Sequence, residues 1–354
     1  MKLFQSVSAG VLALCLALGT GFAQADDGDS VITPTHRFDK ITDGVYFAVG
    51  TGSVYVMSNS MVVIGKKEVL VVDSHVTGAA AQALLKAIKT LTDKPVRYLV
   101  NTHYHFDHAH GNDAFPDGVA IIGHEYTREK LLGPVLEENT FLSFTTSLPE
   151  DIAKLKAQAA SETDATKKAA LKEEVRIQQD YMEATAKIVP TPPTITLREE
   201  LSVHLDDREI RLLFLGRGHT GGDIVVYLPE DRIIFTGDLL LPSLSYMGDG
   251  FVDEWPGTLE ALKQLDFKVV LPGHGAPMTG EQAKTHIGHI QAYLLELWGE
   301  AGKGMLMGKR PGDIAQTVDL SAQAANIPGA PPIGADIRAV TRIYELLNKR
   351  AQLF

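Results

Sequence analysis

Four side chains of metal-ligand type fall within six positions of this sequence, in the run Thr102-His103-Tyr104-His105-Phe106-Asp107-His108. On a helix, residues 103 and 105 would point apart, whereas in an extended or turning loop they can converge on one point. Neutral imidazoles and carboxylates are the ligands that zinc takes when no thiolate is present. The candidate metal ligands of this first cluster are His103, His105, Asp107 and His108.

Three further residues of ligand type each follow an apolar, strand-like run and lie beside glycine. They are His219, Asp238 and His274, which follow the runs 210–215, 233–235 and 269–271. Glycine permits backbone turns that strain other residues, and it lets the chain approach an ion closely. If these strands are neighbours, their loops and the first cluster meet at one edge of the core, where open sheets bearing helices bind ligands.

The elements that must position these residues occur twice in the same order. The first set is predicted as short strands within 41–73 (including 54–56), a helix over 79–91 and a strand at 96–100. The second set is predicted as strands within 194–235, a helix around 258–265 and a strand at 269–271. The polar residues 26–40, before the first set, are expected to be irregular.

Residues 127–188 interrupt this order with a segment rich in Ala, Lys and Glu at helical spacing. Pro149 begins one predicted helix, and a second is predicted from about 163 to 187. We interpret the segment as a helical insertion packed over one end of the core, with a solvated spacer as the alternative. From about 280 to 354 the chain is predicted to form a helical tail.

The start of the chain has the features of a secretory signal peptide, which would cover residues 1–25. Lys2 gives a basic start, an apolar run follows, and Ala23-Gln24-Ala25 is a small-x-small cleavage pattern. A membrane anchor and a lipoprotein linked at Cys15 are the rival interpretations. The apolar run is short for a membrane span, and Leu14 is not the small residue that lipidation favours. We therefore expect an exported protein, periplasmic or secreted, without membrane contact after cleavage.

The cysteine content and net charge limit the metal ligands and the classes of binding partner that we expect. Cys15 is the only cysteine, so the cleaved protein would contain neither a disulfide nor a thiolate ligand. The formal net charge of −11 argues against a nucleic-acid partner, which requires a basic surface. A small-molecule substrate is the expected partner, and the sequence does not indicate the oligomeric state.

The His-x-His-x-Asp-His run, followed by His219, Asp238 and His274 beside glycines, resembles the signature of the metallo-β-lactamase superfamily. The resemblance extends over about residues 41–278. It implies an α/β fold, a four-layer αββα sandwich of two pseudo-symmetric halves, with the helical insertion and the C-terminal helices added to it. Residues 26–354 would then form a single domain.

The resemblance also implies a role for each candidate residue and a cofactor, two Zn²⁺ ions per chain. His103, His105 and His219 would bind the first ion, Asp107, His108 and His274 the second, and Asp238 both. Asp73, at the end of an apolar run, would support the site as a hydrogen-bond acceptor, which metal-bound histidines usually have.

The implied reaction is hydrolysis by a hydroxide held between the two ions, with Asp107 orienting it and handling its proton. Esters, lactones, thioesters and phosphoesters are the candidate substrates. A β-lactamase is the runner-up, although Asp238 stands where the familiar β-lactamases of the superfamily have Cys or Ser. A similar ligand set would also suit an iron-containing redox enzyme of the superfamily or a metal-binding protein without turnover.

The remaining histidines are interpreted by their positions. Three are candidates for lining a substrate pocket: His75, His110 and His124. Four are expected at the surface: His36, His204, His286 and His289.

Overall fold

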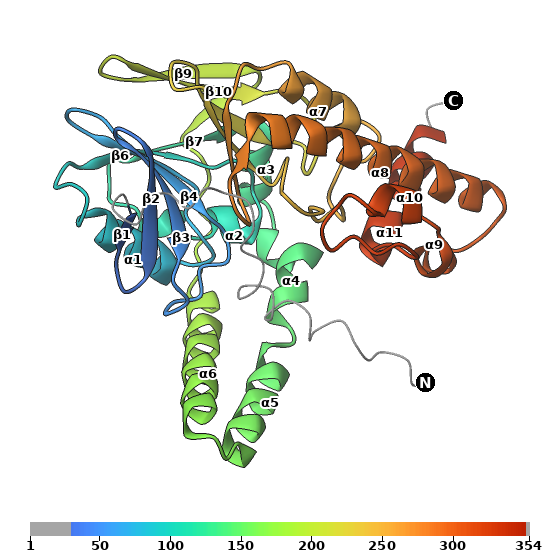
Figure 1. The fold of residues 1–354 in the computed structure, drawn as a ribbon, viewed down its shortest axis with the longest axis horizontal. Coiled ribbons are helices and arrows are strands. Elements are labelled where there is room, and N and C mark those ends of the chain that lie inside the picture. The colour runs from blue at the N-terminus through green and yellow to red at the C-terminus, as the bar shows by residue number, and fades with distance from the viewer. Residues whose placement is uncertain (1–29, 352–354) are drawn as a thin grey trace.

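Two β-sheets lie face to face between helices in the computed structural model, which describes residues 30–351 (Figure 1). The predicted signal peptide, residues 1–25, lies outside the described residues. Helix α1 (Gly78–Ile88) packs on the outer face of the first sheet. Helices α7 (Trp255–Lys263) and α8 (Gly280–Leu306) pack on the outer face of the second. The predicted four-layer αββα sandwich is therefore confirmed.

The first sheet follows chain order from one edge to the other. Its strands are β1 (Ser30–Ile32), β2 (His36–Thr42), β3 (Val45–Gly50), β4 (Ser60–Ile64), β5 (Val69–Val72), β6 (Val96–Val100), β7 (Ala120–His124) and β8 (Ile195–Leu197). The pairs β5–β6, β6–β7 and β7–β8 are parallel. Because parallel strands end at the same edge, the loops after β5 and β6 emerge side by side.

The second sheet supplies the opposing loops. In spatial order its strands are β14 (Met278–Thr279), β13 (Val269–Pro272), β12 (Ile233–Gly237), β11 (Ile224–Leu228), β10 (Arg208–Phe214) and β9 (Glu200–Leu205). Strands β12 and β13 are parallel, and β10 runs in the same direction because β11 is antiparallel to both β10 and β12. The loops after β10, β12 and β13 therefore leave the sheet at one edge.

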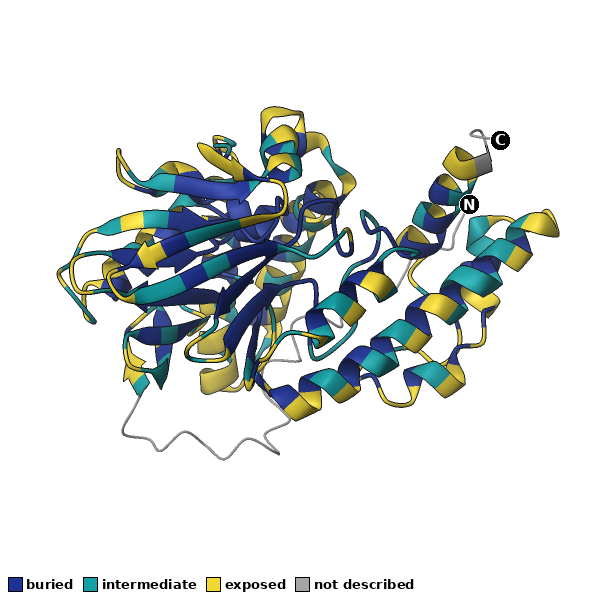
Figure 2. Cartoon of the chain, turned by 90° about the horizontal axis from the view of Figure 1, so that it is seen from above, coloured by how far each residue is buried: buried dark blue, intermediate teal, exposed yellow. Residues whose placement is uncertain are grey.

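Apolar side chains from both sheets fill the space between them. Met61 and Leu70 of the first sheet belong to the same buried cluster as Val226 and Phe235 of the second. Figure 2 shows these central strands as buried, enclosed by helices whose outer faces are exposed. Removal of this apolar surface from water is the main force that holds the two sheets together.

Local signals define the helices that cover the sheets. The Thr77 side chain accepts from the backbone N–H of Ala80 and caps α1. At α8, Thr279 and Gln282 form a capping box. These contacts satisfy N–H groups that have no partner within the first turn of a helix.

Helices fill the segment between β7 and β8. They are α3 (Glu125–Leu132), the 3₁₀ turn η2 (Val135–Glu137), α4 (Asn139–Thr145), α5 (Leu148–Ser161) and α6 (Ala165–Thr185). In Figure 1, α5 and α6 form a hairpin that projects from the sandwich. At its base, Phe141, Leu148 and Tyr181 pack against Val76 and Phe106. The base of the hairpin thus rests on the loop that carries the first ligand cluster.

The C-terminal helices pack on α8. They are α9 (Pro311–Thr317), α10 (Ser321–Ala324) and α11 (Ile337–Ala351). Within residues 30–351, none of the helices has both the length and the apolar character that crossing a membrane requires.

Two local predictions were wrong. Residues 26–40 were expected to be irregular, but β1 and most of β2 lie there. Only His36 and Phe38 of β2 are fully buried, so the strand lacks a clear apolar alternation. Residues 54–56 were expected to form a strand but lie in a loop, where Val54 and Tyr55 pack against the helical hairpin.

Candidate metal centre

The loops at one edge of the sandwich bring all seven predicted ligands together. His103 and His105 follow β6, and the short helix α2 (Phe106–Ala109) carries the next two. The ligand atoms form three groups, each with all its atoms within 4.8 Å of one another. The groups are His103, His105 and His219; His103, His108 and Asp238; and Asp107, His108 and His274.

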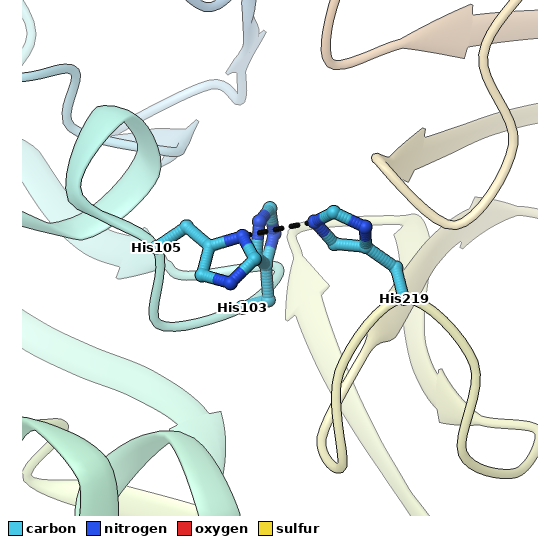
Figure 3. A group of neighbouring side chains, drawn as sticks. All are labelled: His103, His105 and His219. Atoms are coloured by element: carbon cyan, nitrogen blue, oxygen red, sulfur yellow. Dashed lines mark hydrogen bonds between the residues drawn. The ribbon is translucent and has the colours of Figure 1, made fainter. Parts of the chain in front are cut away.

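The first group consists of three imidazoles, of His103, His105 and His219, each at most 3% exposed. Figure 3 shows His103 and His105 on one loop and His219 on the opposite loop, with the rings turned toward a common point. Nδ1 of His105 lies 2.9 Å from Nε2 of His219. Nε2 of His103 is buried and has no hydrogen-bond partner among the described residues. A buried polar atom without a partner is costly, so this geometry suits a bound cation.

Each of these histidines uses its other ring nitrogen to contact the protein. Nδ1 of His103 lies 3.1 Å from the Thr102 hydroxyl. Nε2 of His105 lies 3.2 Å from Asp249, and Nδ1 of His219 lies 2.8 Å from the carbonyl oxygen of Tyr246. Such contacts fix the ring orientation and leave the inward-facing nitrogen free to bind a metal ion.

Asp107, His108 and His274, together with Asp238, are called the second group from here on, and this group mixes imidazoles and carboxylates. Nε2 of His274 lies 3.0 Å from Asp107 and 3.3 Å from Asp238. Nε2 of His108 lies 3.3 Å from each of the same two carboxylates. Asp238 also lies 3.7 Å from Nε2 of His219. Asp238 is therefore placed between the two groups, as a bridging ligand would be.

Asp73 holds the outer side of His108. Its carboxylate lies 2.7 Å from Nδ1 of His108, and both side chains are fully buried. The backbone N–H and the hydroxyl of Thr102 donate to the same carboxylate. Asp73 has a φ of +64°, a conformation that costs energy outside glycine and that is typical of constrained sites. This is the supporting contact that the sequence led us to expect for Asp73.

The electrostatics of the two groups differ. In the first group, burial and the neighbouring histidines lower the pKa of His103 well below its usual value and that of His219 to about 3. In the second, burial opposes charge on His274, but Asp238 and Asp107 outweigh it and raise its pKa to about 10. His108 and His274 likewise hold the pKa of Asp107 well below its usual range. The carboxylates therefore create a demand for positive charge that a metal dication can meet.

Two further aspartates support the site but were not predicted. Asp249 contacts His105 and accepts from the Thr140 hydroxyl of α4. Asp223 is 2% exposed and accepts from the backbone and hydroxyl of Thr220, next to His219. Both lie beside glycine, as His219, Asp238 and His274 do, and this signal could have drawn attention to them.

The remaining histidines only partly follow expectation. His75 and His110 are buried near the cluster and His124 is half-buried, while His204 is exposed and His289 is half-exposed. The prediction that His36 and His286 lie at the surface was wrong. His36 faces inward from the first position of β2 and contacts His75, and His286 lies 2.9 Å from the carbonyl oxygen of Leu241.

A cleft of about 650 Å³ adjoins the first group. Tyr246 and Asp249, the two residues that contact the outer nitrogens of His219 and His105, form part of its wall. The wall also includes Asn139 of α4 and Arg338 and Arg342 of α11. Its volume lies within the range of about 300–1,000 Å³ that is typical of small-molecule sites.

Comparison with known proteins agrees with the fold and the site. Residues 54–274 match the family model of the metallo-beta-lactamase superfamily, and the chain belongs to this superfamily. The relatives of this chain include hydrolases. The histidine and aspartate groups described above fit metal binding.

Individual relatives are distant. The chain is 22% identical to a linear primary-alkylsulfatase of Pseudomonas sp. (strain ATCC 19151), over 72% of this chain and 49% of that protein. It thus aligns with about half the length of the alkylsulfatase. It is 24% identical to a metallo-beta-lactamase type 2 of Bacteroides fragilis, over 69% of this chain and 79% of that one. It is 28% identical to a probable metallo-hydrolase of Bacillus subtilis (strain 168), over 67% and 71% of the two chains.

A solved structure supports the fold. The metallo-beta-lactamase from Pontibacter korlensis superposes with a TM-score of 0.52 at 21% sequence identity. The match covers 72% of this chain and 99% of that one. The sandwich fold is therefore shared with this structure.

Proposed function

We propose that this protein is an exported hydrolase that binds two Zn²⁺ ions and cleaves an ester, lactone, thioester or phosphoester. The observation that supports the proposal most directly is the convergence of seven ligand-type side chains from four loops. Two zinc ions in such a site lower the pKa of water from about 15.7 to about 7 and polarise a substrate oxygen.

The donor set fits two ions of this kind. His103, His105 and His219 would hold the first ion, and Asp107, His108 and His274 the second, with Asp238 between them. Nε2 of His108 and Oδ1 of Asp238 are buried without a hydrogen-bond partner in the described part of the chain. Nitrogen and carboxylate oxygen donors without thiolate are a set that zinc accepts.

Asp107 is the proposed catalytic residue. Its carboxylate lies 3.0 Å from His274, at the more exposed side of the centre, because the His274 side chain is 28% exposed. The neighbouring histidines keep its pKa low, so the carboxylate is ionised at neutral pH. It is therefore able to orient an attacking water molecule and to accept its proton.

β-Lactam hydrolysis is the second candidate, favoured by the match to 79% of the Bacteroides fragilis metallo-beta-lactamase. Asp238 argues against it, because the familiar β-lactamases that the sequence resembles have Cys or Ser at the matching position. A binding protein without turnover would have the same ligands but would release no product.

The test is a metal analysis of the purified protein, followed by a substrate panel with the zinc-loaded protein. We expect two zinc ions per chain and turnover of at least one ester, lactone, thioester or phosphodiester. Turnover of β-lactams alone would favour the second candidate. Zinc binding without any turnover, or full turnover in chelator-treated protein, would overturn the proposal.

Export is part of the proposal and is tested separately. The basic start and the Ala23-Gln24-Ala25 pattern support cleavage after Ala25. We expect the protein in the periplasm or the medium to begin at Asp26, as determined by mass spectrometry. Full-length protein that stays inside the cell would contradict export without affecting the hydrolase assignment.

A further inference from the structure

A line of buried polar side chains runs from the start of β2 to the backbone of Asp107. His36, His75 and Ser58 are each at most 1% exposed. Nε2 of His36 lies 3.2 Å from Nε2 of His75, and Nδ1 of His75 lies 3.2 Å from the Ser58 hydroxyl. That hydroxyl donates to the carbonyl oxygen of Asp107 at 2.5 Å. None of these three side chains is a ligand in the proposed site.

The direction of each hydrogen bond follows from the end at Asp107, because a backbone carbonyl oxygen can only accept. Ser58 gives its one hydroxyl proton to Asp107, so its oxygen accepts from Nδ1–H of His75. With His75 neutral, its Nε2 accepts from Nε2–H of His36. Nδ1 of His36, 3.0 Å from the Thr35 hydroxyl, then accepts from it. One arrangement of protons satisfies every contact.

This row of hydrogen bonds is suited to holding the backbone in place rather than to moving protons. Its inner end is the carbonyl oxygen of Asp107, which does not take up a proton near neutral pH. Burial lowers the pKa of His36 to about 4 and that of His75 well below its usual value, so both imidazoles are neutral. Neutral, fully hydrogen-bonded groups in the interior stiffen the segments that they connect.

The residue after Ser58 holds the loop of another ligand. The backbone N–H of Asn59 donates to the carbonyl oxygen of Gly273 at 2.7 Å. Its side-chain amide donates to the carbonyl oxygens of Pro272 at 3.1 Å and Gly275 at 3.0 Å. Asn59 thus holds the backbone on both sides of His274. Two adjacent residues contact the loops that carry Asp107 and His274.

The first group of ligands has separate supports. Its outer nitrogens contact Thr102, which precedes His103 on the same loop, and Tyr246 and Asp249, which lie between β12 and α7. Ser58 and Asn59 therefore contact the backbone at ligands of the second group, whereas other residues orient the imidazoles of the first group. This asymmetry gives the two residues a role distinct from general packing.

We propose that Ser58 and Asn59, with Ser58 oriented by His75 and His36, are positioning residues that set the distance between Asp107 and His274. They thereby set the affinity of the second metal position. The inference rests on the proposed two-ion site. Removal of a group that orients a metal ligand typically lowers metal affinity by about 10–100-fold.

The test is stepwise binding of Co²⁺ and of Zn²⁺ to the metal-stripped full chain, with a competing chelator and with the cobalt visible spectrum as a second readout. For Ser58→Ala and Asn59→Ala we expect the second ion to bind about 10–100-fold more weakly, with the first within about threefold of the unaltered chain. Thr127→Val is the control, because the Thr127 hydroxyl is buried and has no partner among the described residues.

His75→Asn tests the assigned direction of the hydrogen bonds, in which residue 75 donates to Ser58. Asparagine tolerates the φ of +66° at this position, and its amide can donate to Ser58 from near the place of Nδ1. We expect second-ion affinity within about threefold of the unaltered chain, against the larger loss in Ser58→Ala. Losses of equal size would contradict the assigned direction.

The outcomes separate the two proposals. If the unaltered chain binds two ions and Ser58→Ala binds both as tightly, or weakens both equally, the positioning role is wrong and the hydrolase proposal stands. If the unaltered chain binds no second ion, the two-ion site is wrong, and the positioning role falls with it.

Discussion

The two ligand groups occupy the same edge of the sandwich but differ in chemistry. The first contains three imidazoles, of His103, His105 and His219, each buried and each held by its own outer contact. The second contains carboxylates, and its His274 side chain is 28% exposed. The pKa of His219 is lowered to about 3, whereas that of His274 is raised to about 10.

We infer that the first group mainly holds an ion, whereas the second group also takes part in the proposed reaction. His103 and His219 of the first group have lowered pKa values, so these neutral imidazoles bind a cation without first releasing protons. In the second group, a cation must replace the protons that His108 and His274 would otherwise bind, so its affinity depends on pH. Asp107, the proposed catalytic residue, lies in this second group, whose His274 side chain is 28% exposed.

Removal of the metal ions has the largest expected effect. Because the proposed reaction would depend on the activation of water by metal, chelator-treated protein should lose hydrolysis of every substrate that it turns over, and added Zn²⁺ should restore it. The loss is measured as kcat/KM before and after dialysis. Turnover that persists with less than a tenth of an ion per chain would mean that neither group is catalytic.

Asp107→Asn should have the next largest effect. Loss of the carboxylate removes the proposed proton acceptor, so we expect kcat to fall by about 10²–10⁴-fold with the circular dichroism spectrum unchanged. The matched control is Asp113→Asn, on the nearby η1 turn (Asn112–Ala114), where the carboxylate is part of neither ligand group. A reduction of less than threefold for Asp107→Asn would remove it from the mechanism.

Asp249→Ala should act on the first group alone. His105 would lose the acceptor on Nε2, so we expect the first ion to bind about 10–100-fold more weakly. Competition with a chelator measures this change. An equal effect on both ions would show that the two groups do not have independent supports.

The smallest expected effect is on stability in the metal-stripped protein. The folded pKa of His274 is raised, so it contributes stability below about pH 6.5 that is lost as the pH rises toward about 10. The folded pKa of His219 is depressed, so its contribution is present above about pH 6.5 and is lost as the pH falls toward about 3.

Urea unfolding at a series of pH values tests these opposite slopes. His274→Asn should flatten the alkaline side of the stability profile, and His219→Asn should flatten the acidic side. The slopes are compared rather than the absolute free energies of unfolding, because either substitution in a buried cluster lowers stability. Identical profiles for both variants would contradict the electrostatic difference between the groups.

The sequence was most informative where ligand type and local pattern coincide. His219, Asp238 and His274 each follow an apolar strand and lie beside glycine, so their convergence could be predicted from strands that end at one edge. Asp249 has the glycine neighbours but follows no strand. Its contact with His105 depends on the path of a long loop, which no local pattern encodes.

Buried polar networks were the main features that the sequence did not predict. His36 begins a strand with only two fully buried positions, and it contacts His75, which lies in the loop between β5 and α1. Ser58 and Asn59 are ordinary loop residues by type. Their roles depend on which carbonyl oxygens lie opposite them, and only the packed structure defines these.

The most direct test of the two-ion site is a crystal structure of the zinc-loaded protein with anomalous data at the zinc absorption edge. We expect two peaks, one about 2.0–2.1 Å from the inward nitrogens of His103, His105 and His219. The second should lie among Asp107, His108 and His274, with Asp238 between the two. Zinc bound elsewhere, or a single peak that contacts only one group at saturating zinc, would contradict the account.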